Sequence, residues 1–230
     1  MSSSDSANYH PDGTLFIVSG PSGAGKTTLI DRVREELSPL GLQLHFSVSH
    51  TTRVARSGEM EGVSYYYVPK DAFEQMVERG EFIEWARVHD QMYGTSNSEV
   101  QTRLDRGEDV ILDIDVQGAR KIYENKRLQP HSLSIFVFPP SAAELQRRLQ
   151  TRGLNSPGEI ERRVQKAFEE IESGLSFYDY VIINEDVKRA TECLKAAILA
   201  RKLKTKQALS DLQMMARRFK EEHGRTTRGD

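Results

Sequence analysis

The amino-acid sequence predicts an α/β fold with a largely parallel sheet, and three observations lead to this prediction. A glycine-rich loop, residues 20–28, lies between an apolar run at 15–18 and a helix-like run at 27–37. Residues 109–115 and 133–138 form nearly continuous apolar runs, which are typical of parallel strands covered by helices on both faces. Helix-like segments alternate with these runs, as they do in layered α/β proteins.

The glycine-rich loop fits the pattern G-x-x-x-x-G-K-[ST] through Gly20, Gly25, Lys26 and Thr27. In such a loop the backbone N–H groups cradle phosphate oxygens, and the lysine reaches the outer phosphates. A glycine-rich turn without a ligand is the alternative, and the strand–loop–helix setting disfavours it. The residues expected around a bound nucleotide phosphate are Gly20, Pro21, Ser22, Gly23, Ala24, Gly25, Lys26, Thr27 and Thr28.

Length and composition indicate an ordinary soluble protein that is large enough for one α/β domain or for a core with an inserted subdomain. The net charge of −2 argues against bulk nucleic-acid binding. A single cysteine, Cys193, excludes a disulfide framework, and the scattered histidines lack metal-ligand spacing. No signal peptide or 18-residue apolar span is recognisable, so we expect a cytoplasmic protein without a membrane partner.

The first part of the chain predicts a short arm followed by one strand–helix unit. Residues 1–13 are rich in Ser, Asp and Asn, which predicts a disordered arm. The helix after the loop carries Leu29, Val33 and Leu37 at four-residue spacing, and Pro39 follows it. We assign residues 14–48 to the first part of the core.

Residues 49–107 predict a small α+β insertion. A half-buried strand at 43–49 leads into a polar, basic stretch at 51–59. Further strands are expected at 65–68 and 82–88, with a short amphipathic helix at 71–79 between them and another helix at 98–106.

The core resumes at residues 108–204 with a strand that ends in acidic residues. Asp113 and Asp115 close the apolar run, and the carboxyl end of a parallel strand faces the ligand crevice in such folds. In a phosphate-loop protein an acid at this place commonly helps to hold Mg²⁺. A helix at 116–124 and the strand at 133–138 follow, and Ser141 is placed to cap the next helix.

Two arginine-rich helices, at about residues 141–172, flank a glycine-bearing connector at 153–158. Their arginines are Arg147, Arg148, Arg152, Arg162 and Arg163. A solvated face is the ordinary explanation for such a stripe, but a phosphate-loop kinase also needs mobile cations over the transferred phosphate. A last strand at 180–183 and a helix at 186–203 complete the core.

The end of the chain is basic. Residues 201–230 contain nine Lys or Arg and four Asp or Glu, and apolar residues recur at three- and four-residue spacing. We expect a basic helical tail at 205–230. It either packs back on the core or pairs with another subunit as part of a homo-oligomer.

The ordered motifs resemble those of guanylate kinase of the bacterial type, a phosphate-loop family that phosphorylates GMP with ATP. The resemblance covers about residues 14–203. It is carried by S-V-S-H-T-T-R-V-A-R-S-G-E at 47–59, E-F-I-E at 81–84, Y-G-T at 93–95 and L-D-I-D-V-Q-G at 112–118. It implies a P-loop NTPase fold with a five-stranded parallel core, an inserted GMP-binding domain and a helical lid. It also implies a step in GMP recycling and GTP supply.

The resemblance implies an acceptor site in the insertion. Glu84 matches the acid that reads guanine N1–H and the N2 amine, and an adenine lone pair at N1 would be repelled there. Thr95 stands where some members have Ser, and Val54-Ala55 lacks the proline that many members carry before the second arginine. The implied GMP-binding residues are Ser49, Arg53, Arg56, Tyr65, Glu84, Tyr93, Thr95 and Asp115.

The donor side follows from the same resemblance. Lys26 would span the outer phosphates of ATP, Thr27 would ligate Mg²⁺, and Asp113 would belong to the magnesium environment. Asn184 falls where the adenine pocket is lined. The residues implied in catalysis are Lys26, Arg53, Arg148, Arg152 and Arg163. No general base is expected, because the acceptor phosphate is already ionised at neutral pH.

Two other functions are weighed against ATP:GMP phosphotransfer. Guanylate-kinase-like domains of membrane-associated scaffolds bind phosphorylated partners without catalysis, but the intact phosphate loop disfavours this role. A phosphate-loop kinase acting on another small phosphate is disfavoured by the set Arg53, Arg56 and Glu84.

Overall fold

The structure is a computed structural model that describes residues 13–88, 90–151, 157–203 and 215–217. The predicted arm therefore lies outside the described residues except for Gly13, and so does the predicted tail except for residues 215–217. Within the described residues, no helix is long and apolar enough to cross a membrane.

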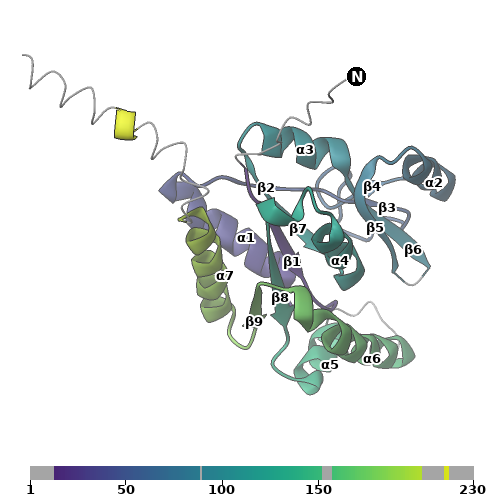
Figure 1. The fold of residues 1–230 in the computed structure, drawn as a ribbon. Coiled ribbons are helices and arrows are strands. Elements are labelled where there is room, and N and C mark those ends of the chain that lie inside the picture. The colour runs from purple at the N-terminus through teal and green to yellow at the C-terminus, as the bar shows by residue number, and fades with distance from the viewer. Residues whose placement is uncertain (1–12, 89, 152–156, 204–214, 218–230) are drawn as a thin grey trace, which may run out of the picture.

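A five-stranded sheet forms the centre of the molecule (Figure 1). Its strand order is β2-β7-β1-β8-β9, and every neighbouring pair is parallel. The bounds are β1 (Leu15–Ser19), β2 (Leu44–Phe46), β7 (Asp109–Ile114), β8 (Ser132–Phe138) and β9 (Tyr180–Ile183). The parallel core that the sequence predicts is confirmed.

Helices cover both faces of this sheet because its central strands are apolar on both sides. Along β1, Phe16 and Val18 pack toward α1 (Lys26–Leu37) and α7 (Val187–Lys202). The alternate residues Leu15 and Ile17 pack with α3 (Asn97–Asp105) and α4 (Val116–Glu124). The alternation follows from the period of two along a strand. The parallel pairing of β1 with β7 places the carboxyl ends of these two strands side by side.

The insertion is a second, smaller sheet of mixed direction. Its strand order is β4-β3-β6-β5, and β3 pairs in parallel with β4 but antiparallel with β6. The bounds are β3 (His50–Thr51), β4 (Tyr66–Tyr67), α2 (Lys70–Glu78), β5 (Phe82–Val88) and β6 (Gln91–Ser96). The sequence predicts no strand between 88 and the helix at 98–106, whereas the structure places β6 there, paired along β5.

The two arginine-rich segments form a helical pair, α5 (Ala142–Thr151) and α6 (Pro157–Gly174). Leu145 and Leu149 of α5 pack on Ile160 and Ala167 of α6 in a small core of their own. The Ser141 hydroxyl accepts a hydrogen bond from the Glu144 N–H at 3.1 Å, as the predicted cap requires. The connector at 152–156, with the predicted site residue Arg152, lies outside the described residues.

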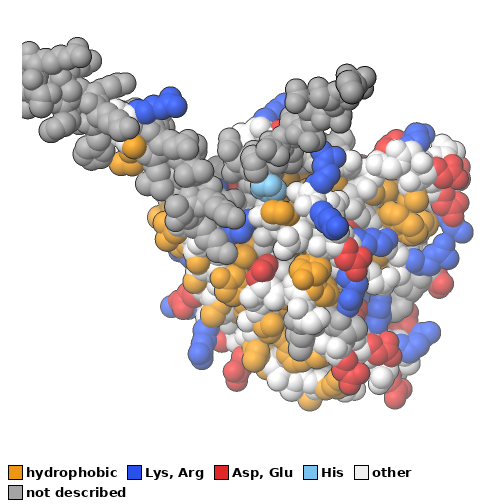
Figure 2. All heavy atoms as spheres, in the orientation of Figure 1, with side chains coloured by type: hydrophobic (Ala, Val, Ile, Leu, Met, Phe, Trp, Pro, Cys, Tyr) orange, Lys and Arg blue, Asp and Glu red, His pale blue; other side chains and the backbone are white. Residues whose placement is uncertain are grey.

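Short 3₁₀ turns complete the secondary structure at η1 (Ser38–Leu40), η2 (Gln129–His131) and η3 (Leu175–Phe177). Figure 2 shows acidic and basic side chains interspersed on the visible face. The edge strand β9 leaves Tyr180, Val181 and Ile183 exposed.

Candidate active site

The loop after β1 turns sharply into α1, and two of its glycines are required by the geometry. Gly20 has φ = 138°, and a Cβ there would lie 2.2 Å from the Val137 carbonyl oxygen. Gly25 has φ = 93°, and a Cβ there would lie 2.4 Å from Asn184 Nδ2. Any side chain at either position would push the loop away from the sheet, so the glycines allow it to wrap the start of α1.

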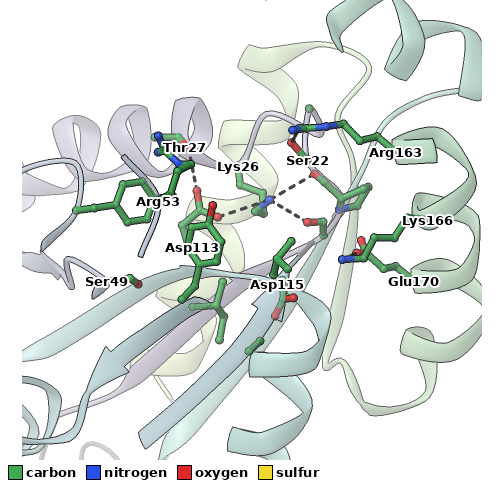
Figure 3. A pocket seen from close by; sticks show the side chains of 18 of the residues that line it. Ser22, Lys26, Thr27, Ser49, Arg53, Asp113, Asp115, Arg163, Lys166 and Glu170 are labelled. Carbon is green, nitrogen blue, oxygen red and sulfur yellow. Dashed lines mark hydrogen bonds and ion pairs between the residues drawn. The ribbon is translucent and has the colours of Figure 1, made fainter. Parts of the chain in front are cut away.

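The loop opens into a cleft that also receives residues from the insertion and from α6 (Figure 3). Most of the predicted site residues line this cleft: Gly20, Pro21, Ser22, Gly23, Gly25, Lys26, Thr27, Ser49, Arg53, Arg56, Tyr65, Glu84, Tyr93, Asp113, Asp115 and Arg163. Five other predicted site residues are described by the structure but are not among those that line the cleft: Ala24, Thr28, Thr95, Arg148 and Asn184.

At the loop end of the cleft, Lys26, Thr27 and Asp113 form one polar group. Lys26 Nζ donates to the Gly20 carbonyl oxygen at 2.8 Å and lies 3.5 Å from Asp113 Oδ1. Thr27 Oγ1 donates to Asp113 Oδ2 at 2.8 Å. The hydroxyl and the carboxylate therefore meet within hydrogen-bond distance, one from the start of α1 and one from β7.

Arg53 is held in a fixed orientation on the insertion side of the cleft. Its guanidinium donates to Glu59 Oε1 at 2.8 Å and to the Val54 carbonyl oxygen at 2.8 Å. Partial burial disfavours the charged form of Glu59. Hydrogen bonds from Arg53, the Arg56 N–H and Tyr67 outweigh this effect and lower the pKa of Glu59 to about 2. The Glu59 carboxylate is therefore charged at neutral pH and keeps its hydrogen bond with Arg53.

Tyrosine rings lie next to Arg53. The Arg53 guanidinium carbon lies 5.3 Å from the ring centroid of Tyr65, and the Tyr65 and Tyr93 rings meet edge to face at 5.8 Å. Burial, followed by the charge of Asp113, raises the pKa of Tyr65 to about 12. Tyr65 is therefore a neutral hydroxyl donor at physiological pH.

At the other end of the cleft, Glu84 is a buried carboxyl group, 5% exposed. Thr95 Oγ1 donates to Glu84 Oε1 at 2.6 Å. Burial is the largest effect on this group and raises the pKa of Glu84 to about 7. A carboxylate in such a place accepts hydrogen bonds strongly from any donor that enters the cleft.

Asp115 sits where β7 ends and α4 begins. Its Oδ1 accepts the Gly118 N–H at 2.9 Å, so the side chain caps the helix. The same residue lines the cleft with Glu84 and Lys26.

The predicted arginines of α5 and α6 have different surroundings. Arg163 donates to Ser22 Oγ of the phosphate loop at 3.1 Å, so this residue bridges α6 to the loop. Arg148 donates to the Asn184 carbonyl oxygen at 2.8 Å and to Glu144 Oε1 at 2.8 Å. Asn184 in turn donates from Nδ2 to the Ala24 carbonyl oxygen at 2.8 Å. Arg148 thus lies behind the loop, outside the cleft wall.

Sequence reasoning missed two charged residues of α6 that line the cleft, Lys166 and Glu170. Together with Arg163 they occupy positions i, i+3 and i+7, which share one face of a helix. The sequence shows this spacing, but a helical pattern alone does not predict which part of the structure a polar face contacts. Ala86, Val88 and Ile114 also line the cleft.

Comparison with known proteins places the chain in a family. A family model described as guanylate kinase matches residues 12–201. The chain is 50% identical over 192 residues to a guanylate kinase of Vibrio vulnificus (strain YJ016), covering 84% of this chain and 90% of the relative. It is 41% identical over 210 residues to a guanylate kinase of Clostridioides difficile (strain 630), covering 91% and 97%.

The fold agrees with a solved structure. The crystal structure of guanylate kinase from Anaplasma phagocytophilum matches with a TM-score of 0.67 and 33% identity, covering 86% of this chain and 91% of that one. The phosphate loop, the inserted sheet and the helical pair found here all fall within the matched part of the chain. The chain belongs to the guanylate kinase family.

Proposed function

We propose that this protein transfers the γ-phosphoryl group of ATP to GMP, giving ADP and GDP. The observation that carries the proposal is a single cleft that joins the phosphate loop, with Lys26 and Thr27, to a buried carboxyl group, Glu84. One end suits nucleotide phosphates, and the other suits a base with hydrogen-bond donors.

Glu84 supports guanine as the acceptor base. Guanine presents two adjacent donors, N1–H and the N2 amine, and a carboxylate accepts both at once. Adenine would instead place the N1 lone pair against the carboxylate and leave a buried group unpaired. Thr95 holds the carboxylate by its 2.6 Å hydrogen bond, and Ser49 lines the same cleft, so we assign both to the guanine end.

Arg53, Arg56, Tyr65 and Tyr93 are proposed to bind the phosphate of GMP. Guanidinium forks suit a phosphate dianion, and neutral phenol hydroxyls add donors. Glu59 and the Val54 carbonyl oxygen set the orientation of Arg53 before a ligand arrives, which limits the conformational entropy lost on binding.

In the proposed reaction an oxygen of the GMP phosphate attacks the γ-phosphorus of ATP in line. The bond from that phosphorus to the β–γ bridging oxygen breaks, and its electron pair leaves with ADP. No general base is needed, because the attacking phosphate oxygen is already largely ionised at neutral pH. Catalysis then rests on alignment and on charge neutralisation by Lys26 and Arg53, together with the lid arginines Arg148, Arg152 and Arg163, which we propose close over the transferring group.

The loop end of the cleft fits Mg²⁺. Thr27 Oγ1 and Asp113 Oδ2 meet at 2.8 Å, and hydroxyl and carboxylate oxygens are the ligand types that this ion prefers. We propose that Thr27 ligates the ion and that Asp113 orients it, directly or through water. The bound ion supplies positive charge to the outer phosphates of ATP. Asn184 is proposed to line the adenine side, and Asp115 the GMP side.

The remaining assignments are also proposals. We take residues 14–48 and 108–204 as the core, 49–107 as the GMP-binding insertion, and about 141–172 as a lid that closes over both nucleotides.

A cytoplasmic location is in keeping with the composition of the chain. Association through the C-terminal segment 205–230 is testable by light scattering of the full chain against a truncation at Lys204.

A coupled assay with ATP and a panel of acceptors tests the function. We expect turnover with GMP and much lower turnover with AMP or CMP at equal concentration. Equal rates with AMP or CMP would contradict the assignment of Glu84 as the base-reading group. Nucleotide binding without any turnover would instead favour a scaffold role.

A further inference from the structure

Helix α6 has three distinct faces, and one of them meets the cleft. Ile160, Val164 and Ala167 face α5 and form the core of the helical pair. Residues 161, 162, 165, 168, 169 and 172 are exposed to solvent. The third face, between these two, carries Arg163, Lys166 and Glu170, and all three line the cleft.

Lys166 and Glu170 form an ion pair whose surroundings differ from those of an ordinary helix-surface pair. Lys166 Nζ lies 3.7 Å from Glu170 Oε1, and the side chains are only 28% and 15% exposed. On α2, Lys70 and Glu74 have the same i, i+4 spacing and the same 3.7 Å distance, but are 67% and 49% exposed. A pair that served only the helix would gain nothing from this burial, because desolvation disfavours both charges.

The charges of the cleft act on this pair. Burial is the largest effect on Glu170 and raises its pKa. The charges of Lys166 and Lys26 lower this pKa, whereas the charge of Asp115 raises it. Figure 3 shows Lys166 and Glu170 projecting from α6 toward the part of the cleft that holds Lys26 and Asp115. The pair therefore faces the junction between the proposed donor and acceptor halves.

The distance within the pair leaves the ammonium group able to take a second partner. At 3.7 Å the contact is longer than the hydrogen bonds of about 2.7–3.2 Å that a lysine makes with a fully engaged carboxylate. A lysine ammonium has three donors, and phosphate oxygens are acceptors of higher charge density than a single carboxylate. Lys166 can thus contact phosphate while Glu170 still limits its direction.

We propose that Lys166 is a phosphate-contacting catalytic residue of the lid: with both nucleotides bound, its ammonium touches the phosphoryl group in transfer, and Glu170 is the positioning residue that aims it. The inference rests on the proposed ATP:GMP transfer and adds a cation to the set Lys26, Arg53 and Arg163. It follows from the place of Lys166 one turn beyond Arg163, on the same face of α6 and in the same cleft.

The test compares Lys166→Met with Lys70→Met, which removes the same charge from a pair of equal spacing on α2. Steady-state kinetics with ATP and GMP should give a kcat about tenfold or more lower for Lys166→Met, with both KM values within about threefold of wild type. Lys70→Met should match wild type. Lys166→Arg should recover most of the lost kcat, because it restores the positive charge.

Two further measurements separate catalysis from folding. The melting temperature without nucleotides should be the same for Lys166→Met and Lys70→Met, and Glu170→Gln should lower kcat by a smaller factor than Lys166→Met. A kcat for Lys166→Met within twofold of wild type would overturn the inference. A raised KM for GMP at unchanged kcat would also overturn it, because it would make Lys166 a ground-state ligand of the acceptor.

The fallback, should Lys166→Met not fold, is Lys166→Gln, which keeps a polar side chain and is judged by the same kcat criterion. If wild type and Lys70→Met are both inactive with GMP, the proposed ATP:GMP transfer is itself refuted, together with the role of Lys166 in it. Activity in those two proteins with unchanged kcat in the Lys166 variants refutes only the present inference.

Discussion

Replacing Glu84 by Gln should make the protein more stable at neutral pH and less selective for GMP. The carboxyl group is 5% exposed, and burial raises its pKa to about 7, from 4.5 for the unperturbed group. A pKa shift of one unit corresponds to about 1.4 kcal/mol. The charged form of Glu84 therefore lowers the free energy of unfolding by about 3 kcal/mol relative to the protonated form.

The sign of the effect sets the pH window. Below pH 4.5 the group is protonated in both the folded and the unfolded chain, so it contributes no pH dependence. Between pH 4.5 and 7 the folded chain keeps a proton that the unfolded chain has lost, and the free energy of unfolding falls as the pH rises. Above pH 7 both forms are charged, and the loss is complete.

Urea unfolding of wild type and Glu84→Gln at several pH values measures this difference. The stability of Glu84→Gln minus that of wild type should increase by about 3 kcal/mol between pH 4.5 and pH 7.5. Glu74→Gln, at an exposed site on α2, is the matched control against which the pH dependence of Glu84→Gln is compared. An increase below about 1 kcal/mol for Glu84→Gln would refute the argument that the site desolvates its carboxylate.

Three other predictions concern the loop end of the cleft. Lys26→Ala should lower kcat by about 100-fold or more while the dissociation constant for GMP, measured by calorimetry, changes less than threefold; unchanged turnover would refute the phosphate-loop assignment. Asp113→Asn should raise the Mg²⁺ concentration for half-maximal velocity by about tenfold, in a titration at fixed ATP, because Thr27 loses an anionic partner. Gly25→Ala should destabilise the protein by about 1–3 kcal/mol in urea unfolding, since its Cβ would meet Asn184 Nδ2; wild-type stability would contradict the observed loop geometry.

The core of the fold could be predicted from the sequence because its signals are local and strong. The apolar run before Asp113 and the run at 180–183 coincide with β7 and β9, and the helix at 116–124 coincides with α4. The secondary structure of the insertion is harder to predict from the sequence. Strand β6 contains Gly94 and several polar residues; it pairs along β5, and the Phe73–Phe82 stack at 4.6 Å packs against Gly94. Such tertiary contacts leave little trace in a single segment of sequence.

The candidate site was predictable where a motif fixes the backbone and less so where a helix must be oriented in space. The phosphate loop and the two acids at the carboxyl end of β7, Asp113 and Asp115, line the cleft. Arg148 and Arg163 look equivalent in sequence, yet Arg163 reaches Ser22 in the loop while Arg148 donates to the Asn184 carbonyl oxygen. The packing of α5 on α6 determines which groups each arginine contacts. Each arginine is far in sequence from the residue it contacts, so the sequence alone does not predict these contacts.

The selectivity of the guanine end depends on the core as well as on the insertion. A Cβ at Gly118 of α4 would lie 2.4 Å from Glu84 Oε2, so a larger residue there would force the carboxyl group to shift. Lys121 of the same helix donates to the Trp85 carbonyl oxygen and lies 4.3 Å from the Trp85 ring centroid, which ties α4 to β5. Because Gly118 packs directly on the Glu84 carboxyl group, a larger residue there should displace this group and lower the selectivity for guanine without contacting GMP. The carboxylate comes from the insertion, but a helix of the core forms part of its surroundings.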